Sequence, residues 1–345
     1  IWLKLTLAPS SQPDWVVMFQ PNFIHHIETW TPLEGGGWHH SVVGIKHAFN
    51  SRDIKAVVPS VAVQPSPDSE TVIYAKVVSP TTPLYAQVIS AKDAREFDTL
   101  IYLVGGVFMG IGVLVGLVSF MVFVATRDNL WLLDSAYNLI GLVVLSLHLG
   151  IFSPLVAPAS QDLVDQLNLF GNVIYVVLTS LLYYRIFGLF TLSRWLVLPN
   201  LFAPVVSVYL IWLIIQGHAD QAMAINNLLV FFLSLLGFVI VFFARHSDRS
   251  LLMSFRLFYI MSITYFMWWS ISVVLQKQTE NFAALYPGFP VAVFSLLMLT
   301  LILVRNTQLK IQHALRVEMQ RQQVERDLEL ARMRHEETNS FYGML

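Results

Sequence analysis

The chain has 345 residues, of which 56% are hydrophobic and only 12% are charged. Soluble proteins carry about a quarter of charged residues, so the composition excludes an ordinary soluble chain. The net charge of -1 gives no reason to expect a nucleic acid partner. The absence of cysteine excludes disulfides, thiolate metal sites and a cysteine nucleophile.

The charges divide the chain into three regions. Residues 99–304 contain only seven basic and seven acidic residues, whereas the far shorter stretch 305–345 contains seven and six. We predict an all-β domain over residues 1–97, a helical membrane domain over 98–304 and a charged helix over 305–345. The chain opens on a strand, without Met or a leader, so we expect a fragment whose β domain is incomplete at its N-terminus.

The first region shows short segments in which apolar and polar residues alternate, separated by Pro, Gly, Ser and Asp. The predicted strands are Ile1–Leu7, Trp15–Phe19, Ile24–Trp30, Val57–Val63, Thr71–Val78 and Leu84–Ser90. Strands at this spacing, without a helical pattern, are typical of an antiparallel sandwich or jelly roll. A short connector, Ala91–Asp98, is expected to join the last strand to the first membrane helix.

The middle region contains seven apolar segments, each long enough to cross a bilayer, which takes about 20 helical residues. They are Thr99–Ala125, Leu130–Ile151, Asp165–Ile186, Leu196–Gln216, Ala222–Ala244, Leu251–Leu275 and Leu285–Val304. Arginines follow the first, third and fifth segments, and Arg305 with Lys310 follows the seventh, while Lys277 is the only basic residue in the loops between. Since loops rich in Lys and Arg lie on the cytoplasmic side of the membrane, the β domain is predicted to be periplasmic and the C-terminal helix cytoplasmic.

The C-terminal region is polar and has no Gly or Pro before Gly343. A sparse heptad repeat runs through Val317, Val324, Ala331, Thr338 and Leu345, with Ala314 and Leu328 at the intervening positions and the polar Arg321 and His335 on the same seam. The pattern favours a parallel two-stranded coiled coil, and therefore a homodimer. A solvated single helix is the alternative, because long charged helices need not pair.

Three tryptophans of the β domain, Trp15, Trp30 and Trp38, lie close together in the sequence near a Gly-Gly-Gly loop. They either pack within the domain or form a flat surface on which the apolar face of a sugar ring stacks. They are our candidate ligand-binding residues.

Five of the ten histidines also lie in this domain. Neutral imidazoles bind zinc, but neighbouring strand residues point to opposite faces, so each His-His pair supplies at most one ligand. No carboxylate completes a metal-binding spacing. We predict no metal site, with His25 and His39 as the nearest candidates.

Within the membrane segments, Asp134 and Arg256 are the candidate polar residues, each about one turn inside the cytoplasmic end. They either form an ion pair or extend toward the headgroups. The last segment has no lysine for a retinal Schiff base, and the segments show neither an inverted repeat nor a central charge typical of transporters.

Several stretches resemble the bacterial seven-transmembrane receptors with diverse intracellular signalling modules (7TMR-DISM). The strands Trp2–Leu7 and Thr71–Val78, followed by Leu84–Ser90 and the first helix, are similar to the sensor domain of that family and its junction with the membrane. This chain has Met109-Gly110 where the family more often has Tyr-Gly. The resemblance implies a jelly-roll sensor domain like a carbohydrate-binding module.

The last ten residues, Glu336–Leu345, resemble the segment that precedes the phosphoacceptor histidine of sensor histidine kinases. There a Phe, two variable residues and Met-Leu come just before that histidine, as Phe341 and Met344-Leu345 do here. The resemblance implies that the chain stops short of the phosphoacceptor. No catalytic residue and no cofactor are expected in this fragment, and ATP and Mg²⁺ are expected for the missing kinase domain.

We therefore predict the receptor region of a bacterial two-component sensor histidine kinase in the inner membrane. A carbohydrate-like ligand or a protein partner would be sensed in the periplasm, and the output would reach a response regulator or partner kinases. Two alternatives stay open. The same architecture drives a diguanylate cyclase or phosphatase, or the chain is a transporter with an accessory β domain.

Overall fold

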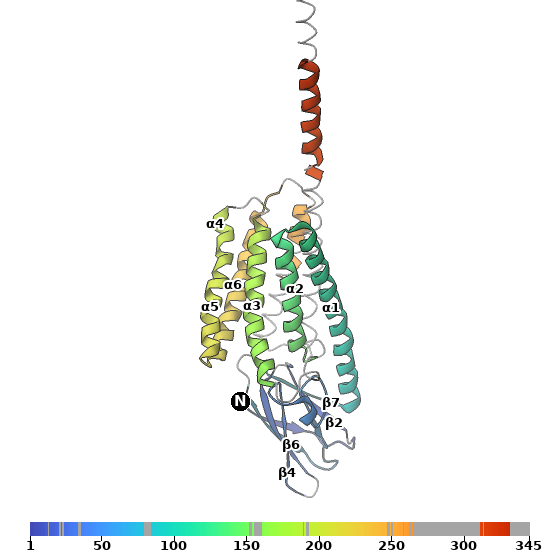
Figure 1. Cartoon of the computed structure of the whole chain (residues 1–345). Helices are drawn as coiled ribbons and strands as arrows, with labels where there is room; N and C mark the ends of the chain where they lie inside the picture. The colour runs from blue at the N-terminus through green and yellow to red at the C-terminus, as the bar shows by residue number, and fades with distance from the viewer. Residues whose placement is uncertain are drawn as a thin grey trace, which may run out of the picture. The chain divides into compact units, whose positions relative to one another are not determined.

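The computed structural model (Figure 1) describes two stretches of the chain. The first is residues 1–261 without 13, 21, 23, 34–35, 79–83, 152–153, 155–160, 189, 191–192, 247–248, 250 and 258, together with residue 264. The second is residues 311–331 without 313. The chain divides into two compact units, Ile1–Leu297 and Met298–Leu345, which are described separately.

The N-terminal region is an antiparallel sandwich of two sheets. The strands are β1 (Trp2–Leu7), β2 (Trp15–Gln20), β3 (His26–Pro32), β4 (Trp38–Val43), β5 (Ser60–Val63), β6 (Thr71–Val78) and β7 (Tyr85–Ser90). One sheet has the order β1-β6-β3-β4 and the other β5-β2-β7. The predicted fold class is confirmed, but the sequence patterns missed β4, which pairs with β3 in a hairpin.

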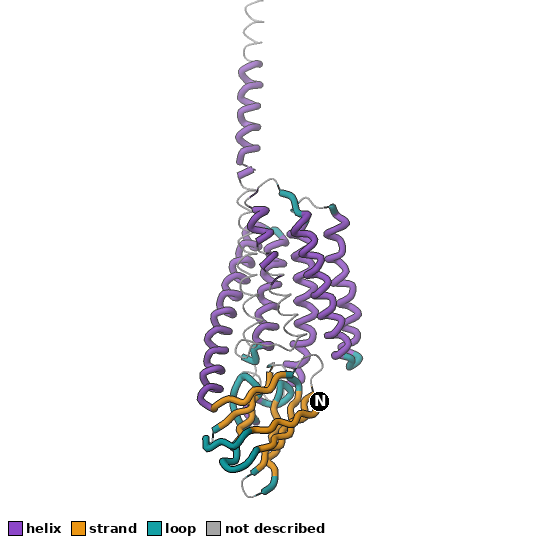
Figure 2. The backbone as a smooth tube through the Cα atoms, turned by 180° about the vertical axis from the view of Figure 1, so that it is seen from behind, coloured by secondary structure: helices purple, strands orange, loops and turns teal. Residues whose placement is uncertain are grey.

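Strand β2 is buried on both faces, unlike a strand of an isolated sandwich. Val17 and Phe19 lie in the core between the two sheets, together with Ile27 and Ile73. Val16 and Met18 instead pack against Ile101, Leu145 and Leu149 of the helices. The β5-β2-β7 sheet is therefore covered by the other sheet on one face and by the ends of helices on the other (Figure 2).

The helices of the first unit are α1 (Ala91–Thr126), α2 (Asn129–His148), α3 (Gln161–Phe187), α4 (Arg194–Val197), the 3-10 helix η4 (Leu198–Leu201), α5 (Phe202–Ile215) and α6 (Ala219–Phe243). In the described part of the chain, five helical stretches are long and apolar enough to cross a membrane, with α4, η4 and α5 acting as one. They coincide with the first five predicted segments. A sixth helix runs from Leu251 to Met261, and the seventh segment lies outside the described residues.

Helix α1 follows β7 without a connector. Ser90 ends the strand and caps the helix, because its side chain accepts a hydrogen bond from the Asp93 amide. The predicted connector Ala91–Asp98 is thus wrong: these residues form the first turns of α1, and the predicted domain boundary at 97/98 falls inside the helix. Residues Ala91–Asp98 include few apolar side chains, so the sequence pattern did not indicate a helix here, and Ser90 was not recognised as its N-cap. A strand that continues into a helix transmits a displacement directly.

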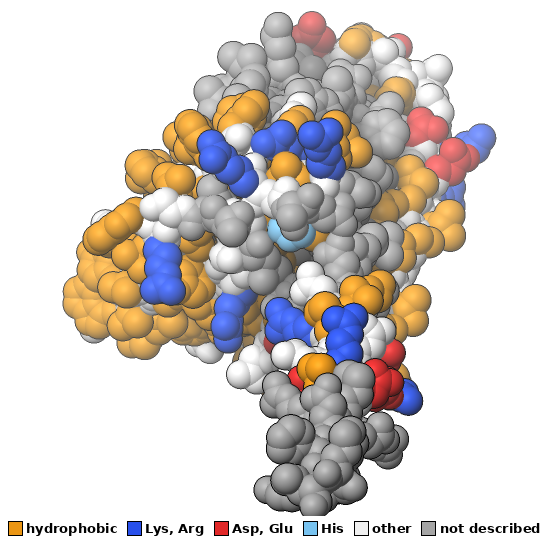
Figure 3. All heavy atoms as spheres, turned by 90° about the horizontal axis from the view of Figure 1, so that it is seen from above, with side chains coloured by type: hydrophobic (Ala, Val, Ile, Leu, Met, Phe, Trp, Pro, Cys, Tyr) orange, Lys and Arg blue, Asp and Glu red, His pale blue; other side chains and the backbone are white. Residues whose placement is uncertain are grey.

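The membrane helices pack through small residues. Gly112 and Gly116 of α1 face Leu142 and Leu139 of α2, with space for no larger side chain unless the leucines move. Arg127 follows α1, Arg185 lies in the last turn of α3 and Arg245 follows α6. Figure 3 shows Lys and Arg side chains gathered on the corresponding face of the molecule.

In the second unit, the described residues 311–331 form a helix. Arg321 and Glu325 are paired one turn apart at 3.1 Å. The apolar side chains of this helix are exposed, among them Val317, Val324 and Leu328 of the predicted seam.

Candidate functional site

The outward face of the β1-β6-β3-β4 sheet gathers aromatic and charged side chains. The pleat fixes this, because alternate residues of each strand point away from the core. The register then sets Trp30 of β3 opposite Tyr74 of β6 and His40 of β4. We define the outer sheet face by these side chains: Trp2, Lys4, His26, Glu28, Trp30, Trp38, His40, Tyr74 and Lys76.

The aromatic rings on this face are in contact. Trp2 and Trp30 stack with ring centroids 5.2 Å apart and planes inclined by 23°. The His40 ring lies 5.2 Å from Trp30, and Trp38 lies 5.6 Å from Tyr74. Trp2 is 64% and Trp38 51% exposed, so flat apolar surface faces solvent. A stacked aromatic surface offers a flat apolar area against which the apolar side of a planar or ring-shaped molecule can stack.

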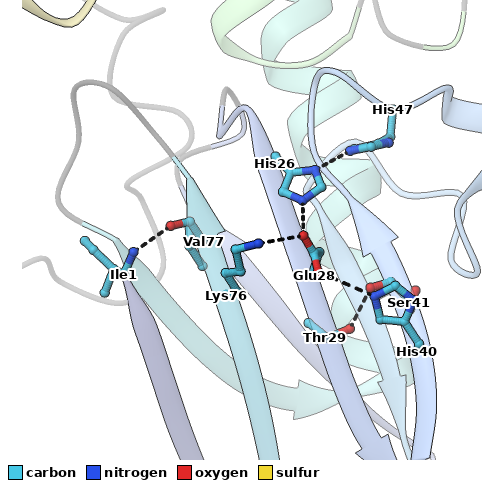
Figure 4. A network of polar contacts seen from close by, with 9 residues as sticks. All are labelled: Ile1, His26, Glu28, Thr29, His40, Ser41, His47, Lys76 and Val77. Carbon is cyan, nitrogen blue, oxygen red and sulfur yellow. Dashed lines mark hydrogen bonds and ion pairs between the residues drawn. The ribbon is translucent and has the colours of Figure 1, made fainter.

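Glu28 is the centre of a polar network on the same face (Figure 4). Its carboxylate lies 2.7 Å from His26 Nε2 and accepts a hydrogen bond of 3.1 Å from Lys76 Nζ. His40 Nε2 lies 3.7 Å from its second oxygen. Hydrogen bonds from His26 and then Lys76 lower the pKa of Glu28 to about 2. The carboxylate is therefore ionised at all physiological pH values and fixes the neighbouring donors.

The structure brings two of the three predicted tryptophans together. Trp30 and Trp38 lie on the outer sheet face, whereas Trp15 lies on β2 of the other sheet, where its indole donates to Ser10 Oγ at 3.2 Å. Trp2, which was not among the predicted ligand-binding residues, belongs to the aromatic surface.

The two nearest metal candidates, His25 and His39, contact different carboxylates in different parts of the structure. His39 Nε2 lies 3.1 Å from Asp53 Oδ2, and His25 Nε2 lies 3.0 Å from Asp165 Oδ1 of α3. Hydrogen bonds from Ser41 and then His39 lower the pKa of Asp53. Within the described residues, no group of three His, Asp or Glu side chains is arranged to hold a metal ion.

A second site of interest is the contact of the β domain with the helices, which we call the junction. It is formed by Asn22, His25, Lys46 and Val57 with Asp98, Leu149, Gly150 and Asp165. The Asn22 side-chain amide donates to the Leu149 carbonyl at 2.9 Å at the end of α2. The Val57 amide donates to Asp98 of α1 at 2.7 Å. Hydrogen bonds from the β domain thus reach α1 and α2.

The third contact of the junction is ionic. Asp165 of α3 lies between His25 and Lys46, at 3.0 Å and 3.6 Å. The carboxylate is mostly buried, with 13% of its side chain exposed, so the charge pairs are less screened than on an open surface. Together with the previous contacts, the β domain is joined to each of the first three membrane helices.

The two intramembrane candidates have different partners. Asp134 of α2 is fully buried and accepts a hydrogen bond of 2.6 Å from Ser119 of α1. Arg256 donates to the Ala244 carbonyl at 3.2 Å, just after the end of α6. Asp134 therefore joins α1 to α2, and Arg256 caps a helix end. Neither contact is the ion pair considered from the sequence.

Sequence reasoning did not find Glu28, Lys76 and Tyr74 because they meet only through the pairing of β3 with β6, which are far apart in the chain, and it did not find His40 because it missed β4. Without β4, the register that sets Trp30 beside His40 has no basis. The available signal was the Gly36-Gly37 pair, whose positive φ angles are typical of a hairpin turn, followed at the end of the strand by the β-branched residues Val42 and Val43.

A β-sandwich with an exposed aromatic face, continuous with apolar helices and joined to three of them, defines a membrane protein with an attached extracellular-type domain. Residues 1–89 match the family described as 7TMR-DISM extracellular 2. This part of the chain is a 7TMR-DISM extracellular domain, and the resemblance seen in the sequence is confirmed to that extent. No curated protein and no solved structure matches the chain.

Proposed function

We propose that the chain is the receptor region of a bacterial two-component sensor histidine kinase in the inner membrane. The β domain lies in the periplasm, and the C-terminal helix enters the cytoplasm. The observation that carries the proposal is the direct continuation of a 7TMR-DISM extracellular domain into α1 through the Ser90 cap. Arginines at the far ends of α1, α3 and α6 support the orientation.

The ligand site of this receptor is the outer sheet face. Trp2 and Trp30 supply a stacked surface, Trp38 and Tyr74 extend it, and the polar network around Glu28 supplies hydrogen-bonding groups beside it. Aromatic surface next to fixed polar groups fits a carbohydrate-like ligand, whose rings have one apolar side and a rim of hydroxyls. A protein partner is the other occupant that the exposed face admits.

The signal passes through the junction. A ligand that binds one arrangement of the β domain more tightly shifts the population of the helix arrangements that go with it. Three connections, at Asp98, Leu149 and Asp165, couple the sandwich to α1, α2 and α3. The helices change the pitch or rotation of the C-terminal helix pair in a homodimer, whose exposed Val317, Val324 and Leu328 would form the seam.

The test is a series of insertions of one to seven residues after Leu328 in the full-length protein, with autophosphorylation as the measured output. A rotating or register-shifting helix pair predicts that output rises and falls with a period near half a heptad, because each inserted residue turns the helix by about 100°. Insertions outside the pair, in the loop after α6, are the control. Equal output from every insertion would contradict the proposal.

Two other outputs are distinguished by simple observations. A diguanylate cyclase or phosphatase domain downstream of Leu345 would keep the receptor and replace the kinase. A transporter would move solute across the membrane of proteoliposomes without any cytoplasmic enzyme. The buried polar contact of Asp134 joins two helices and offers no observation in favour of a transport path.

A further inference from the structure

The side chains of His26 and His47 face one another across the edge of the outer sheet face, outside the aromatic surface (Figure 4). His26 Nδ1 lies 2.6 Å from His47 Nε2, and the ring centroids are 4.8 Å apart. His26 begins β3, and His47 lies in the turn that follows β4. The other nitrogen of His26 is held by Glu28 at 2.7 Å.

This geometry limits how many protons the pair can hold. A hydrogen bond between two imidazoles needs one nitrogen with a proton and one without. The contact therefore forms when both rings are neutral or when one is charged. When both are charged, two N–H groups point at one another with no acceptor between them, and two positive charges lie side by side. The rings must then separate.

The neighbouring residues connect this pair to the helices. Backbone hydrogen bonds join Ile45 to Ile24 at 2.9 Å and Lys46 to His25 at 3.1 Å. A Cβ at Gly44, whose φ is +128°, would lie 2.6 Å from the His25 carbonyl oxygen, so only glycine permits this close approach. The two segments thus move together.

The residues next to the imidazole pair are those that hold α3. His25 precedes His26 and Lys46 precedes His47, and both contact Asp165 of α3. We propose that the His26–His47 pair is a proton-binding site of the β domain, whose full protonation separates the two rings, displaces the joined segments 24–26 and 44–47, and alters their hold on Asp165. The inference rests on the proposed sensing role of the β domain and adds acid as a signal that this domain receives.

The surrounding charges set the direction of the response. Burial, and then the charges of His26 and Arg52, lower the pKa of His47, while Glu28 acts in the opposite direction. Lys76 of β6 and His40 of β4 also face the network, through Glu28. A histidine whose pKa is lowered stays neutral at neutral pH, so the closed pair is fully present above the ordinary pKa of about 6.5 and is lost as the pH falls through the lowered pKa of His47.

His25 is the titratable group on the helix side of the same segment. Its protonation strengthens the attraction to Asp165, whereas separation of the neighbouring pair displaces the backbone that carries it. The two effects differ in the residue that causes them. Replacing His47 removes the second and keeps the first, so a single variant separates them.

The test uses spin labels, since the chain has no cysteine of its own. Cysteines replace Asn50, beside the His47 turn, and Leu163, an exposed residue of α3, in the whole chain in lipid nanodiscs. Distances between the labels are measured at pH 8 and pH 5 with a chelator present. The wild-type background is expected to change its distance distribution between the two pH values. His47→Gln, which keeps a hydrogen-bonding group without the titration, is expected to lose the change caused by ring separation and to keep only the part that comes from the His25–Asp165 contact.

His39→Gln is the matched control, because His39 pairs with Asp53 and has no contact with His26. It is expected to respond as the wild-type background does. An unchanged distribution in the wild-type background, or a full response in His47→Gln, would overturn the proposal. A response that appears only with added Zn²⁺ would also overturn it, because the site would then hold a metal. If His47→Gln differs at pH 8, the titration of ¹³C-labelled histidine in the wild type decides: two rings that titrate independently contradict a shared pair.

The readout does not involve the kinase. Failure of the insertion series with a normal pH response would reject the proposed output and keep the proton site. A normal insertion series without a pH response would do the reverse.

Discussion

The backbone amide of Val57 donates a hydrogen bond of 2.7 Å to the Asp98 carboxylate of α1, 41 residues further along the chain. Val57 itself is fully buried beside Ile101 and Leu149. The bond joins the segment before β5 to the second turn of α1, and α1 itself follows directly from β7. The β domain is thus attached to α1 at two points, and it cannot rotate about the β7–α1 connection without breaking the bond.

Replacing Asp98 by Ala is expected to loosen this attachment. The bond is partly buried, and a hydrogen bond to a charged group contributes about 1.5–3 kcal/mol, so the thermal midpoint of the β domain in nanodiscs should fall. Asp98→Asn keeps an acceptor oxygen and should lose less. The midpoint is followed by tryptophan fluorescence, to which Trp2, Trp15, Trp30 and Trp38 of the β domain contribute. Equal effects of the two variants would show that the carboxylate oxygen does not hold Val57.

Gly150 offers a second test of the junction. Its φ is +72°, and a Cβ at this position would lie 2.9 Å from the Val57 side chain and 3.0 Å from the Val57 carbonyl oxygen. Gly150→Ala is therefore expected to add a collision at the junction to backbone strain of about 1–2 kcal/mol.

Gly217→Ala is the matched control. Gly217 has a similar φ of +82°, but nothing lies within 4 Å of its added Cβ. The difference in thermal midpoint between the two variants measures the collision alone. If the two variants lose the same stability, the close approach of Gly150 to Val57 contributes nothing.

Structural features that depend on residues close together in the sequence could be predicted, and those that depend on residues far apart in the sequence could not. Alternation along Trp2–Leu7 and Thr71–Val78 identifies strands and faces, since it is a local property of the pleat. Apolar length identifies the first five membrane helices for a similar reason. Strand β4 was not predicted because its first half, Trp38–His40, is exposed throughout and shows no alternation.

The junction could not be predicted. Asn22 and Leu149 are 127 residues apart, and neither lies in a recognisable motif. A polar residue before a strand and a carbonyl at the end of a helix become partners only through the packing of β2 on the helices. The aromatic surface lies between these cases. Its tryptophans were visible in the sequence, but their arrangement required the register of four strands.

Binding to the outer sheet face is tested with Trp38. This side chain is 51% exposed, so Trp38→Ala removes aromatic surface without opening the core. Loss of one stacking contact of about 1 kcal/mol is expected to weaken the binding of a soluble β-linked glucose oligomer about fivefold. Calorimetry on the chain in nanodiscs measures the affinity. Trp15→Phe, on the other sheet, should bind as the unchanged chain does, and equal weakening by both variants would place the ligand elsewhere.

The last prediction concerns the pH dependence of stability through Glu28. Its pKa is about 2 in the folded chain, and an unfolded glutamate has a pKa of about 4.3. Between these values the unfolded state binds more protons, so the stability that Glu28 contributes is complete above pH 4.3 and is lost as the pH falls toward 2. Glu28→Gln has no such titration. Its thermal midpoint should therefore be lower at pH 7 and should depend less on pH between 5 and 2.5.

Glu70→Gln, at an exposed carboxylate just before β6, is the control for the removal of one negative charge. It should keep the pH dependence of the unchanged chain. The same measurement in high salt separates the contributions of the two partners. Salt screens the ion pair with Lys76, whose side chain is 40% exposed, more than it screens the short hydrogen bond with His26. A Glu28→Gln variant with the unchanged pH profile would mean that Lys76 and His26 do not hold the carboxylate in solution.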